Sequence, residues 1–308
     1  MTQDARSPHK TAVWIAAMRP RTLPLAIASI ILGSSLAAAW QPFSWAITLL
    51  CIVTAVLLQI LSNLANDFGD SQHGADHSER QGPTRAVQSG AISSNTMLTA
   101  MAFTAGLSIV FGLLLLWVAF GTNSREYLIL FIILGAFAIA AAIAYTAGVR
   151  PYGYAGLGDL SVLLFFGWVA VLGSYFLQTQ RWDWPILLPA TSSGLLAVAV
   201  LNVNNIRDIE SDRIAGKRTI PVRIGPTQAR IYHWVLLISA MVFALLYVLI
   251  VFSSIWQLLF LLVIPLLIKN GLSVSRTFDP LKLNPQLKQL SLATLLFVLL
   301  FSIGQILS

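Results

Sequence analysis

Charged residues are scarce in this sequence, in which Asp, Glu, Lys and Arg together make up 10% of 308 residues. Soluble globular domains carry about 25% charged residues, so this composition excludes a soluble domain. Cysteine is scarcer still, because the single Cys51 lies within an apolar run. A disulfide framework and a thiolate metal site are therefore excluded. Only four histidines are present, which leaves few of the soft ligands that zinc prefers.

Apolar residues make up 57% of the sequence and occur in long runs. A bilayer core about 30 Å thick needs about 20 apolar residues per helix, whereas barrel strands would alternate over about ten residues. The sequence therefore predicts one all-α integral membrane domain over 1–308, with nine spans, of which the short eighth is the weakest prediction. The expected spans are Leu23–Trp40, Trp45–Leu64, Thr96–Phe120, Tyr127–Gly148, Leu157–Leu177, Pro185–Asn205, His233–Phe252, Ile255–Ile268 and Leu287–Leu307.

The basic residues are distributed unevenly among the loops. If the N-terminus is cytoplasmic, seventeen of the nineteen Lys and Arg residues lie on the cytoplasmic side, and only Arg125 and Arg181 lie outside. This positive-inside pattern explains the net charge of +7 without a nucleic-acid partner. It predicts a multi-pass protein of the cell membrane in which the segment 1–21 and two acidic loops, 67–95 and 207–232, are cytoplasmic.

The two acidic loops carry related motifs. The first copy reads Asn66-Asp67-Phe68-Gly69-Asp70 and is followed by Asp76. The second copy reads Asn204-Asn205-Ile206-Arg207-Asp208 and is followed by Asp212. Each copy has the pattern Asn-x-x-x-Asp at the end of an apolar run, with another Asp and basic residues after it. The repeat predicts two related halves with one site between them, an arrangement that secondary transporters also use.

The residue types in these motifs indicate a metal and a phosphate ligand. Paired carboxylates with Asn carbonyls are hard oxygen ligands that suit Mg²⁺. Asp208 and Asp212 are four residues apart and can share one helix face. Basic residues that can neutralise phosphate oxygens follow the motifs or stand nearby, namely Arg80, Arg85, Arg150, Lys217 and Arg218. Together these groups indicate a diphosphate with a lipid tail, although acidic residues at helix ends also form ordinary solvated rims.

Several other residues leave two interpretations open. Tyr145 is either a residue of the interfacial aromatic belt or a ring that stabilises a developing carbocation. Asp159 either caps the fifth helix or contacts a substrate. A polar stripe through Gln59, Asn63, Asn66 and Asp70 lies on one helix face, and such stripes in a membrane usually face a cavity or a partner.

Five stretches of the sequence resemble the intramembrane UbiA-type aromatic prenyltransferases. Within that family they are most similar to the branch that prenylates 1,4-dihydroxy-2-naphthoate in menaquinone biosynthesis. The stretches are Arg19-Pro-Arg-Thr-Leu-Pro24, Gln59-Ile-Leu-Ser-Asn-Leu-Ala-Asn-Asp67, Gly82-Pro-Thr-Arg85, Arg150-Pro-Tyr-Gly-Tyr-Ala-Gly-Leu-Gly-Asp159 and Asn204-Asn-Ile-Arg-Asp208. The resemblance extends from residue 19 to about residue 225, and beyond it only hydrophobicity and length are similar.

The resemblance implies a bundle of nine helices around a central cavity, capped by the two acidic loops. It assigns Mg²⁺ and diphosphate binding to Asn66, Asp70, Asp208 and Asp212, assisted by Asn204 and Asp76. The family often places the last acid of the first motif four residues after Asp70, where this chain has Gly74, so either Asp76 or Asp67 would take that role.

The resemblance also implies the substrates and the reaction. It places Tyr145 near the reacting carbon and Arg150 near the diphosphate, and Gln59, Asn63 and Arg21 are candidates for contacts with the aromatic acceptor. The expected reaction transfers a polyprenyl group from its diphosphate to 1,4-dihydroxy-2-naphthoate, with loss of CO₂, and gives demethylmenaquinone. Another aromatic acceptor, such as 4-hydroxybenzoate or homogentisate, and a cation-coupled transporter are the alternatives.

Overall fold

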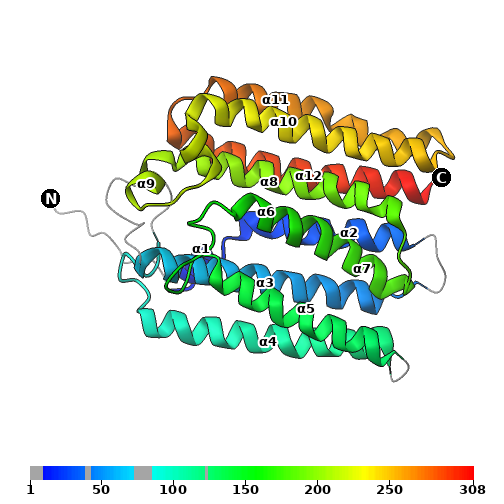
Figure 1. Ribbon diagram of the computed structural model, residues 1–308, viewed down its shortest axis with the longest axis horizontal. Helices are drawn as coiled ribbons and strands as arrows, with labels where there is room; N and C mark the ends of the chain where they lie inside the picture. Colours follow the sequence, from blue (N-terminus) through cyan, green and yellow to red (C-terminus); the bar gives the residue numbers. More distant parts are fainter. Residues whose placement is uncertain (1–9, 39–42, 73–84, 122–123) are drawn as a thin grey trace.

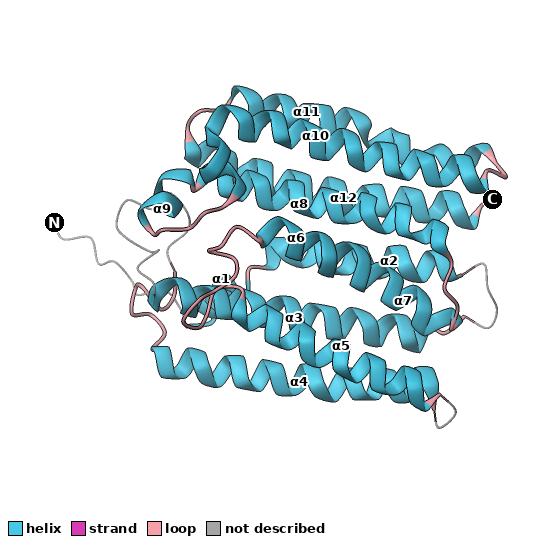
Figure 2. Ribbon diagram, in the orientation of Figure 1, coloured by secondary structure: helices cyan, strands magenta, loops and turns pink. Residues whose placement is uncertain are grey.

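The computed structural model describes residues 10–38, 43–72, 85–121 and 124–308, which fold into helices without a strand (Figure 2). Short 3-10 or π segments join several of the helices into longer rods. The α-helices are α1 (Lys10–Met18), α2 (Leu23–Ala37), α3 (Trp45–Gln72), α4 (Ser94–Phe120), α5 (Arg125–Ala144), α6 (Gly158–Val162), α7 (Ala170–Thr179), α8 (Leu187–Arg207), α9 (Ile209–Ile214), α10 (Ile220–Val251), α11 (Ile264–Arg276) and α12 (Asn284–Ile306). The short segments are η1 (Pro20–Thr22), η2 (Leu163–Val169), η3 (Trp184–Ile186), η4 (Ile255–Val263) and η5 (Pro280–Leu283).

Within the described residues, nine helical rods are long and apolar enough to cross a membrane. This confirms the predicted all-helical bundle of nine spans. The eighth span is also confirmed, because η4 and α11 together form a rod of 22 residues, Ile255–Arg276. Prediction from hydropathy ended this span too early because the polar residues of α11 at its far end lower the local hydropathy.

The rods run side by side along the long axis of the molecule, with α9 at one end of the bundle (Figure 1). The end that carries α9 is called the α9 end below. The rod that contains α8 is the most enclosed, because 72% of the residues in its most apolar stretch are buried, whereas only 6% are buried in the corresponding stretch of α5. The α8 rod is therefore the centre of the packing, and α5 turns most of its apolar surface outward, as expected for a helix that faces lipid.

Helix α2 packs very closely against α7 at Gly33. A Cβ atom added at Gly33 would lie 2.2 Å from the carbonyl oxygen of Val171 and 2.1 Å from the hydroxyl oxygen of Ser174. Small residues allow membrane helices to approach in this way, and van der Waals packing rather than water exclusion then holds the helices together.

We expect Gly33→Ala to lower the free energy of unfolding by about 1–3 kcal/mol, because overpacking forces the two backbones apart. Thermal unfolding of the purified protein in detergent measures this effect. Gly106→Ala is the matched control, since Gly106 lies in α4 with no atom within 4 Å of its added Cβ, and alanine there favours the helix. Equal melting temperatures for the two variants would contradict the proposed close contact.

The region before the first predicted span contains an additional helix, α1. Its residues Val13, Trp14 and Ala17 pack on a cluster that includes Leu61 and Leu64 of α3. Arg19 follows with a left-handed backbone conformation, at a φ of 50°, and turns the chain into η1 and α2. Helix α3 also continues beyond its predicted end, so that both Asp67 and Asp70 lie within a helix and not in the following loop.

Candidate active site

A cavity of about 1450 Å³ runs through the half of the bundle formed mainly by α2, α3, α4, α5, α7 and α8. Its inner part is apolar and includes Ile30, Leu116 and Phe166. At the α9 end the lining becomes charged, with Asp70, Asp208, Asp212, Arg85, Arg207 and Lys217. Small-molecule pockets commonly measure about 300–1000 Å³, so this cavity has room for a large ligand with a charged head and an apolar body.

Asp70, in the last turns of α3, is the most heavily contacted carboxylate of the first motif. Its Oδ2 atom lies 2.5 Å from the Nη2 atom of Arg85. Its Oδ1 atom lies 2.8 Å from the Nζ atom of Lys217 and accepts a hydrogen bond of 2.9 Å from the Tyr154 hydroxyl. Asp70 is only 1% exposed, and these charged partners offset the cost of removing its carboxylate from water.

Asp67 has different partners, although it also lines the cavity. Its two carboxylate oxygens accept hydrogen bonds of 3.0 Å from the backbone amides of Ala86 and Val87. These bonds hold the returning chain against α3 and so place Arg85 beside Asp70. Asp67 therefore positions the loop, and its oxygens are already occupied by amides.

The second motif forms a compact cluster where α8 ends and α9 begins. Arg207 donates from Nε to Oδ1 of Asp208 at 2.7 Å and from Nη2 to Oδ2 at 2.5 Å. The same guanidinium donates to the side-chain oxygens of Asn204 and Asn284, each at 2.8 Å. Arg207 is 3% exposed, so this bidentate pair is shielded from water and ties the first turn of α12 to the motif.

Lys217 joins the two motifs. Its Nζ atom lies 2.8 Å from Oδ1 of Asp70 and 3.7 Å from Oδ1 of Asp212. The structure therefore brings both copies of the repeat to one place, as the sequence predicts for a single site between two halves. The ammonium group also lies 4.7 Å from the centre of the Tyr154 ring, a cation–π contact that further fixes its position.

Hydrogen bonds join the loop that carries Tyr154 to the segment that carries Lys217. The backbone amide of Arg218 donates to the carbonyl of Tyr154 at 2.9 Å. The Arg223 guanidinium then bridges the two segments, donating to the carbonyl oxygens of Arg218 at 2.8 Å and Ala155 at 2.6 Å. Gly156 makes this approach possible, because its φ is +82° and an added Cβ would lie 2.3 Å from the Arg218 carbonyl oxygen.

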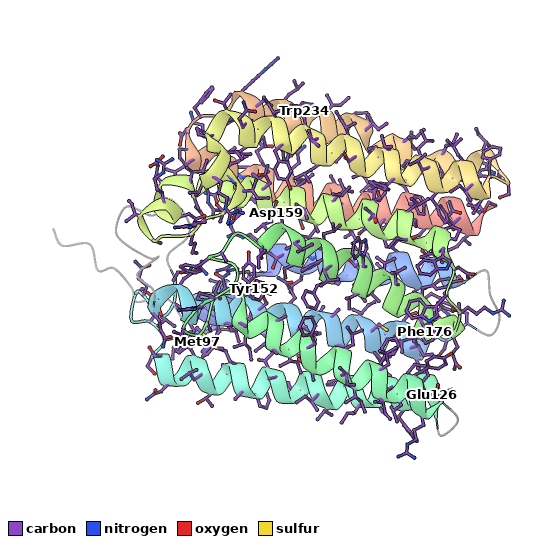
Figure 3. All side chains as sticks on the ribbon, viewed as in Figure 1. Met97, Glu126, Tyr152, Asp159, Phe176 and Trp234 are labelled. Carbon is purple, nitrogen blue, oxygen red and sulfur yellow. The ribbon has the colours of Figure 1, made fainter. Side chains whose placement is uncertain are left out.

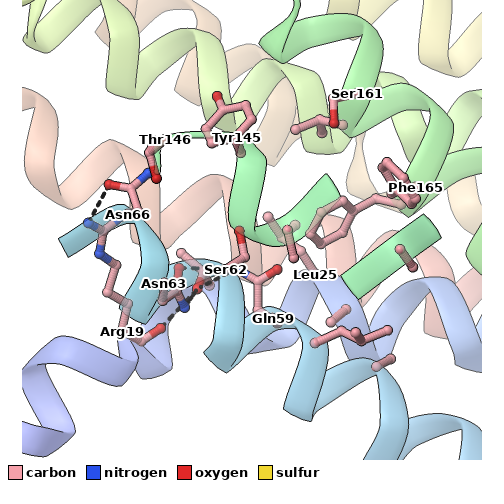
Figure 4. A pocket seen from close by; sticks show the side chains of 18 of the residues that line it. Arg19, Leu25, Gln59, Ser62, Asn63, Asn66, Tyr145, Thr146, Ser161 and Phe165 are labelled. Atoms are coloured by element: carbon pink, nitrogen blue, oxygen red, sulfur yellow. Dashed lines mark hydrogen bonds between the residues drawn. The ribbon is translucent and has the colours of Figure 1, made fainter. Parts of the chain in front are cut away.

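The polar stripe of α3 faces the cavity (Figure 4). Asn66 accepts a hydrogen bond of 3.0 Å from Nη2 of Arg19, which is drawn in Figure 4. Asn63 donates to the Met18 carbonyl at 2.9 Å, and Gln59 donates to the Thr22 hydroxyl at 3.2 Å. The chain around η1 thus provides hydrogen-bond partners for the polar side chains of the stripe and forms one wall of the cavity. Arg21, from the same turn, also lines the cavity.

Tyr145 lies just beyond α5 and lines the cavity (Figure 4). Its ring packs edge to face with the Tyr152 ring, with 5.3 Å between centroids. Added Cβ atoms at Gly153 and Gly158 would lie 3.1 Å and 2.7 Å from the side chain, so these two glycines make room for the ring. Burial and then the nearby Asp159 carboxylate raise the pKa of the Tyr145 phenol, which stays uncharged at neutral pH.

The family model for the UbiA prenyltransferase family matches residues 26–293. This chain belongs to the UbiA prenyltransferase family. Its relatives include the 1,4-dihydroxy-2-naphthoate octaprenyltransferases of Escherichia coli strain K12 and of Haemophilus influenzae. The first is 48% identical over 97% of this chain and 96% of that protein, and the second is 47% identical over 96% of each.

Solved structures of the family share the fold. A UbiA homolog from Archaeoglobus fulgidus bound to GPP and Mg²⁺ aligns with a TM-score of 0.63 at 15% identity and covers 96% of this chain and 100% of that one. The UbiA homolog from Aeropyrum pernix K1 aligns with a TM-score of 0.67 at 16% identity and covers 92% of this chain and 97% of that one. With these neighbours and the nine apolar rods, this prenyltransferase is a multi-pass membrane protein.

Some expected site residues lie elsewhere in the prenyltransferase. Arg150 is exposed and is not among the residues that line the cavity. Asp76 and Arg80 lie outside the described residues. Asp159 does not cap its helix, because Leu157 is the N-cap residue, and its Oδ2 atom instead accepts a hydrogen bond of 2.9 Å from Tyr232 of α10. Asp159 is 8% exposed and lies at the start of α6, inside the bundle (Figure 3).

Three further residues contact the predicted site, namely Arg207, Tyr154 and Arg19. Arg207 belongs to the second motif, and its spacing of three residues from Asn204 was a usable signal. Tyr154 lies in one of the stretches that resemble the family, but no pattern in the sequence connects it with Asp70. Arg19 fits the positive-inside pattern of the segment 1–21, and its contact with Asn66 depends on the turn after α1, which the sequence does not show.

Proposed function

We propose that this prenyltransferase moves a polyprenyl group from polyprenyl diphosphate to 1,4-dihydroxy-2-naphthoate, with release of diphosphate and CO₂. One observation carries the proposal: Asp70 of the first motif and Asp212, the acid that follows the second, meet at Lys217, at the charged end of a large apolar cavity. The names of the bacterial relatives at 47% and 48% identity support the choice of acceptor. The product of this reaction is the naphthoquinol form of demethylmenaquinone, because the step involves no oxidant.

The residues at the α9 end fit Mg²⁺ as the cofactor. Among the described residues, no three carboxylate, histidine or cysteine side chains form a ready cluster for a metal. Mg²⁺ does not need one, because it usually takes one or two carboxylates and completes its shell with water and substrate phosphates. The oxygens of Asp70, Asp208 and Asp212, with those of Asn66 and Asn204, are the hard donors it requires. When bound there, Mg²⁺ would act as a Lewis acid on the diphosphate.

The basic side chains bind and stabilise the leaving group. As the allylic carbon–oxygen bond breaks, the electron pair leaves with the diphosphate, and its negative charge increases. Arg85, Arg207 and Lys217 converge on the carboxylates at the same end of the cavity and are placed to stabilise that charge. Arg85 and Arg207 are buried and the Lys217 side chain is only 14% exposed, so little water competes with the diphosphate for their charges.

The cavity wall controls the fate of the allylic cation. Apolar side chains exclude water, which would otherwise capture the cation. The ring of Tyr145 presents an uncharged π face that can stabilise positive charge near the site. The ring carbon of the acceptor that bears the carboxylate then attacks, a carbon–carbon bond forms, and loss of CO₂ restores the aromatic ring. Gln59, Asn63 and Arg21 line the same cavity and are our candidates for binding the acceptor.

The orientation in the membrane follows from the charge distribution. We place the α9 end, with the N-terminus and both acidic loops, in the cytoplasm, where seventeen of the nineteen basic residues would lie. This places the charged head of the diphosphate at the cytoplasmic surface and its polyprenyl chain in the apolar part of the cavity.

The decisive assay combines purified protein, Mg²⁺, a polyprenyl diphosphate and carboxyl-labelled 1,4-dihydroxy-2-naphthoate, with 4-hydroxybenzoate and homogentisate in parallel. We expect Mg²⁺-dependent release of labelled CO₂ together with a prenylated naphthoquinol. Prenylation of only one of the other acceptors would keep the chemistry and overturn the choice of acceptor. No product from any acceptor in folded protein would contradict the proposal and favour cation-coupled transport.

Arg223→Ala tests whether the bridge between the two loop segments matters for binding. We expect the KM for polyprenyl diphosphate to rise about tenfold, because two hydrogen bonds that fix Tyr154 and Lys217 over Asp70 are lost, while kcat changes much less. Steady-state kinetics with a varied diphosphate concentration measures this. The control is Arg213→Ala, which removes an exposed arginine that is paired with Glu210. Similar KM values for both variants would contradict the bridging role.

A further inference from the structure

A second hollow, of about 770 Å³, lies on the outer side of α11, η5 and the start of α12. Helix α11 forms part of the outer edge of the bundle, and its C-terminal end is at the α9 end (Figure 1). The hollow is lined by Pro265, Ile268, Lys269, Leu272, Ser273, Arg276, Thr277, Lys282 and Gln286. No residue lines both this hollow and the central cavity, so the two are separate. The name "α11 groove" is used for it below.

Three cations converge on the α11 groove from two elements. Lys269 and Arg276 come from α11, and Lys282 comes from η5. Lys282 is paired with an acid, because its Nζ atom lies 3.8 Å from Oδ2 of Asp279. In the part of the chain that the structure describes, neither Lys269 nor Arg276 has a carboxylate within ion-pair distance. The groove is therefore strongly positive.

Lys269 lies where the apolar part of α11 gives way to its polar end. It directly follows Ile268 and lies seven residues, or about 10 Å along the helix axis, before the end of α11. Its neighbours on the same face are Pro265, Ile268 and Leu272, and the last two are 45% and 40% exposed. The groove therefore joins an apolar surface to a cluster of cations, which suits a ligand that has both an apolar part and an anionic group.

We propose that the α11 groove binds the headgroup of an anionic phospholipid. The phosphate would lie among Lys269, Arg276 and Lys282, with the Ser273 hydroxyl as a further hydrogen-bonding group. The acyl chains would lie against Ile268 and Leu272. Basic pockets between membrane helices on the cytoplasmic side bind anionic headgroups in this way. Charge and shape favour a lipid over free phosphate, because a free anion would leave the apolar half of the groove unused.

Native mass spectrometry of the intact protein tests the proposal, after reconstitution with equal amounts of phosphatidylglycerol and phosphatidylcholine. We expect retained phosphatidylglycerol, and about a hundredfold weaker binding in the triple variant Lys269→Gln, Arg276→Gln, Lys282→Gln, at about fivefold per cation. The matched control is Lys10→Gln, Arg213→Gln, Lys288→Gln, which removes three exposed charges that do not line the groove. It should retain the lipid.

The remaining outcomes are equally decisive. An equal loss of phosphatidylglycerol in both triple variants would show a general effect of surface charge and would overturn the site. Displacement of the lipid by millimolar inorganic phosphate would show a site for the free anion instead. Lys269→Met keeps the apolar stem and suits a membrane helix, so it should fold if the triple variant does not. Undiminished lipid selectivity in folded Lys269→Met would also overturn the proposal.

Discussion

Asp208→Asn is expected to lower the turnover number of this prenyltransferase by about a thousandfold or more, which corresponds to about 4 kcal/mol in the activation barrier. Asparagine keeps the shape of the side chain and one oxygen, but it removes the negative charge that would hold Mg²⁺. It also leaves Arg207 without its bidentate partner, so the guanidinium loses its fixed position beside Asn204. Both effects reduce stabilisation of the leaving diphosphate.

The fold should tolerate this substitution. The backbone amide of residue 208 donates to the Asn204 carbonyl at 3.1 Å, and the backbone carbonyl of residue 208 accepts from the Asp212 amide at 2.8 Å. Neither hydrogen bond depends on the side chain at position 208. Initial rates with saturating substrates and Mg²⁺ give the turnover number, and the melting temperature checks folding. Glu210→Gln is the control, since Glu210 is exposed on the same short helix and is paired with Arg213. A rate for Asp208→Asn near that of the wild type would contradict the assignment of Asp208.

The fold was largely predictable because hydropathy and charge asymmetry each report on the bilayer. The ends of the helices were not predictable, because hydropathy detects only the apolar segment of a helix and a helix can continue beyond that segment. Helix α3 runs on to Gln72, and Met18, Arg19 and Thr22 supply partners for its polar face as far as Asn66. Those partners come from the turn after α1, and no local pattern in α3 could show them.

The charged site was predictable in its acids and less so in its bases. Asp70 and Asp208 stand out because their motif is repeated, and a repeat is visible in one sequence. Arginines follow no such pattern, since every basic residue near a helix end also satisfies the positive-inside rule. A phosphate contact was expected for Arg150, but this residue is exposed. Arg207, in contrast, is buried and paired with Asp208. Only the folded arrangement separates the two.

Binding of metal and diphosphate to this prenyltransferase is expected to be strongly cooperative. The carboxylates that would hold Mg²⁺ are already in contact with cations, since Asp70 touches Arg85 and Lys217, and Asp208 touches Arg207. A metal ion alone must compete with these cations, and a diphosphate alone must approach buried carboxylates. When both bind, the cations can move to the diphosphate while the carboxylates take the metal, so each ligand reduces the cost of binding the other.

Mn²⁺ binding followed by electron paramagnetic resonance measures this coupling without turnover. We expect inorganic diphosphate to raise the affinity for Mn²⁺ by about 10–100-fold, after correction for Mn²⁺ bound to diphosphate in solution. Arg207→Gln should change both the Mn²⁺ affinity and its dependence on diphosphate, because it removes the cation paired with Asp208 and one group that would bind the diphosphate. It should bind Mn²⁺ more tightly than the wild type in the absence of diphosphate, and respond less when diphosphate is added.

Arg213→Gln again serves as the control, because its partner Glu210 lies on the exposed face of α9. It should reproduce the wild-type affinity and the wild-type response to diphosphate. If the wild type binds Mn²⁺ equally well with and without diphosphate, and Arg207→Gln does not change either affinity, the ion pairs do not restrain the carboxylates. Metal binding would then depend on oxygens that these cations leave accessible, and Asn66 and Asn204 would be the first residues to substitute.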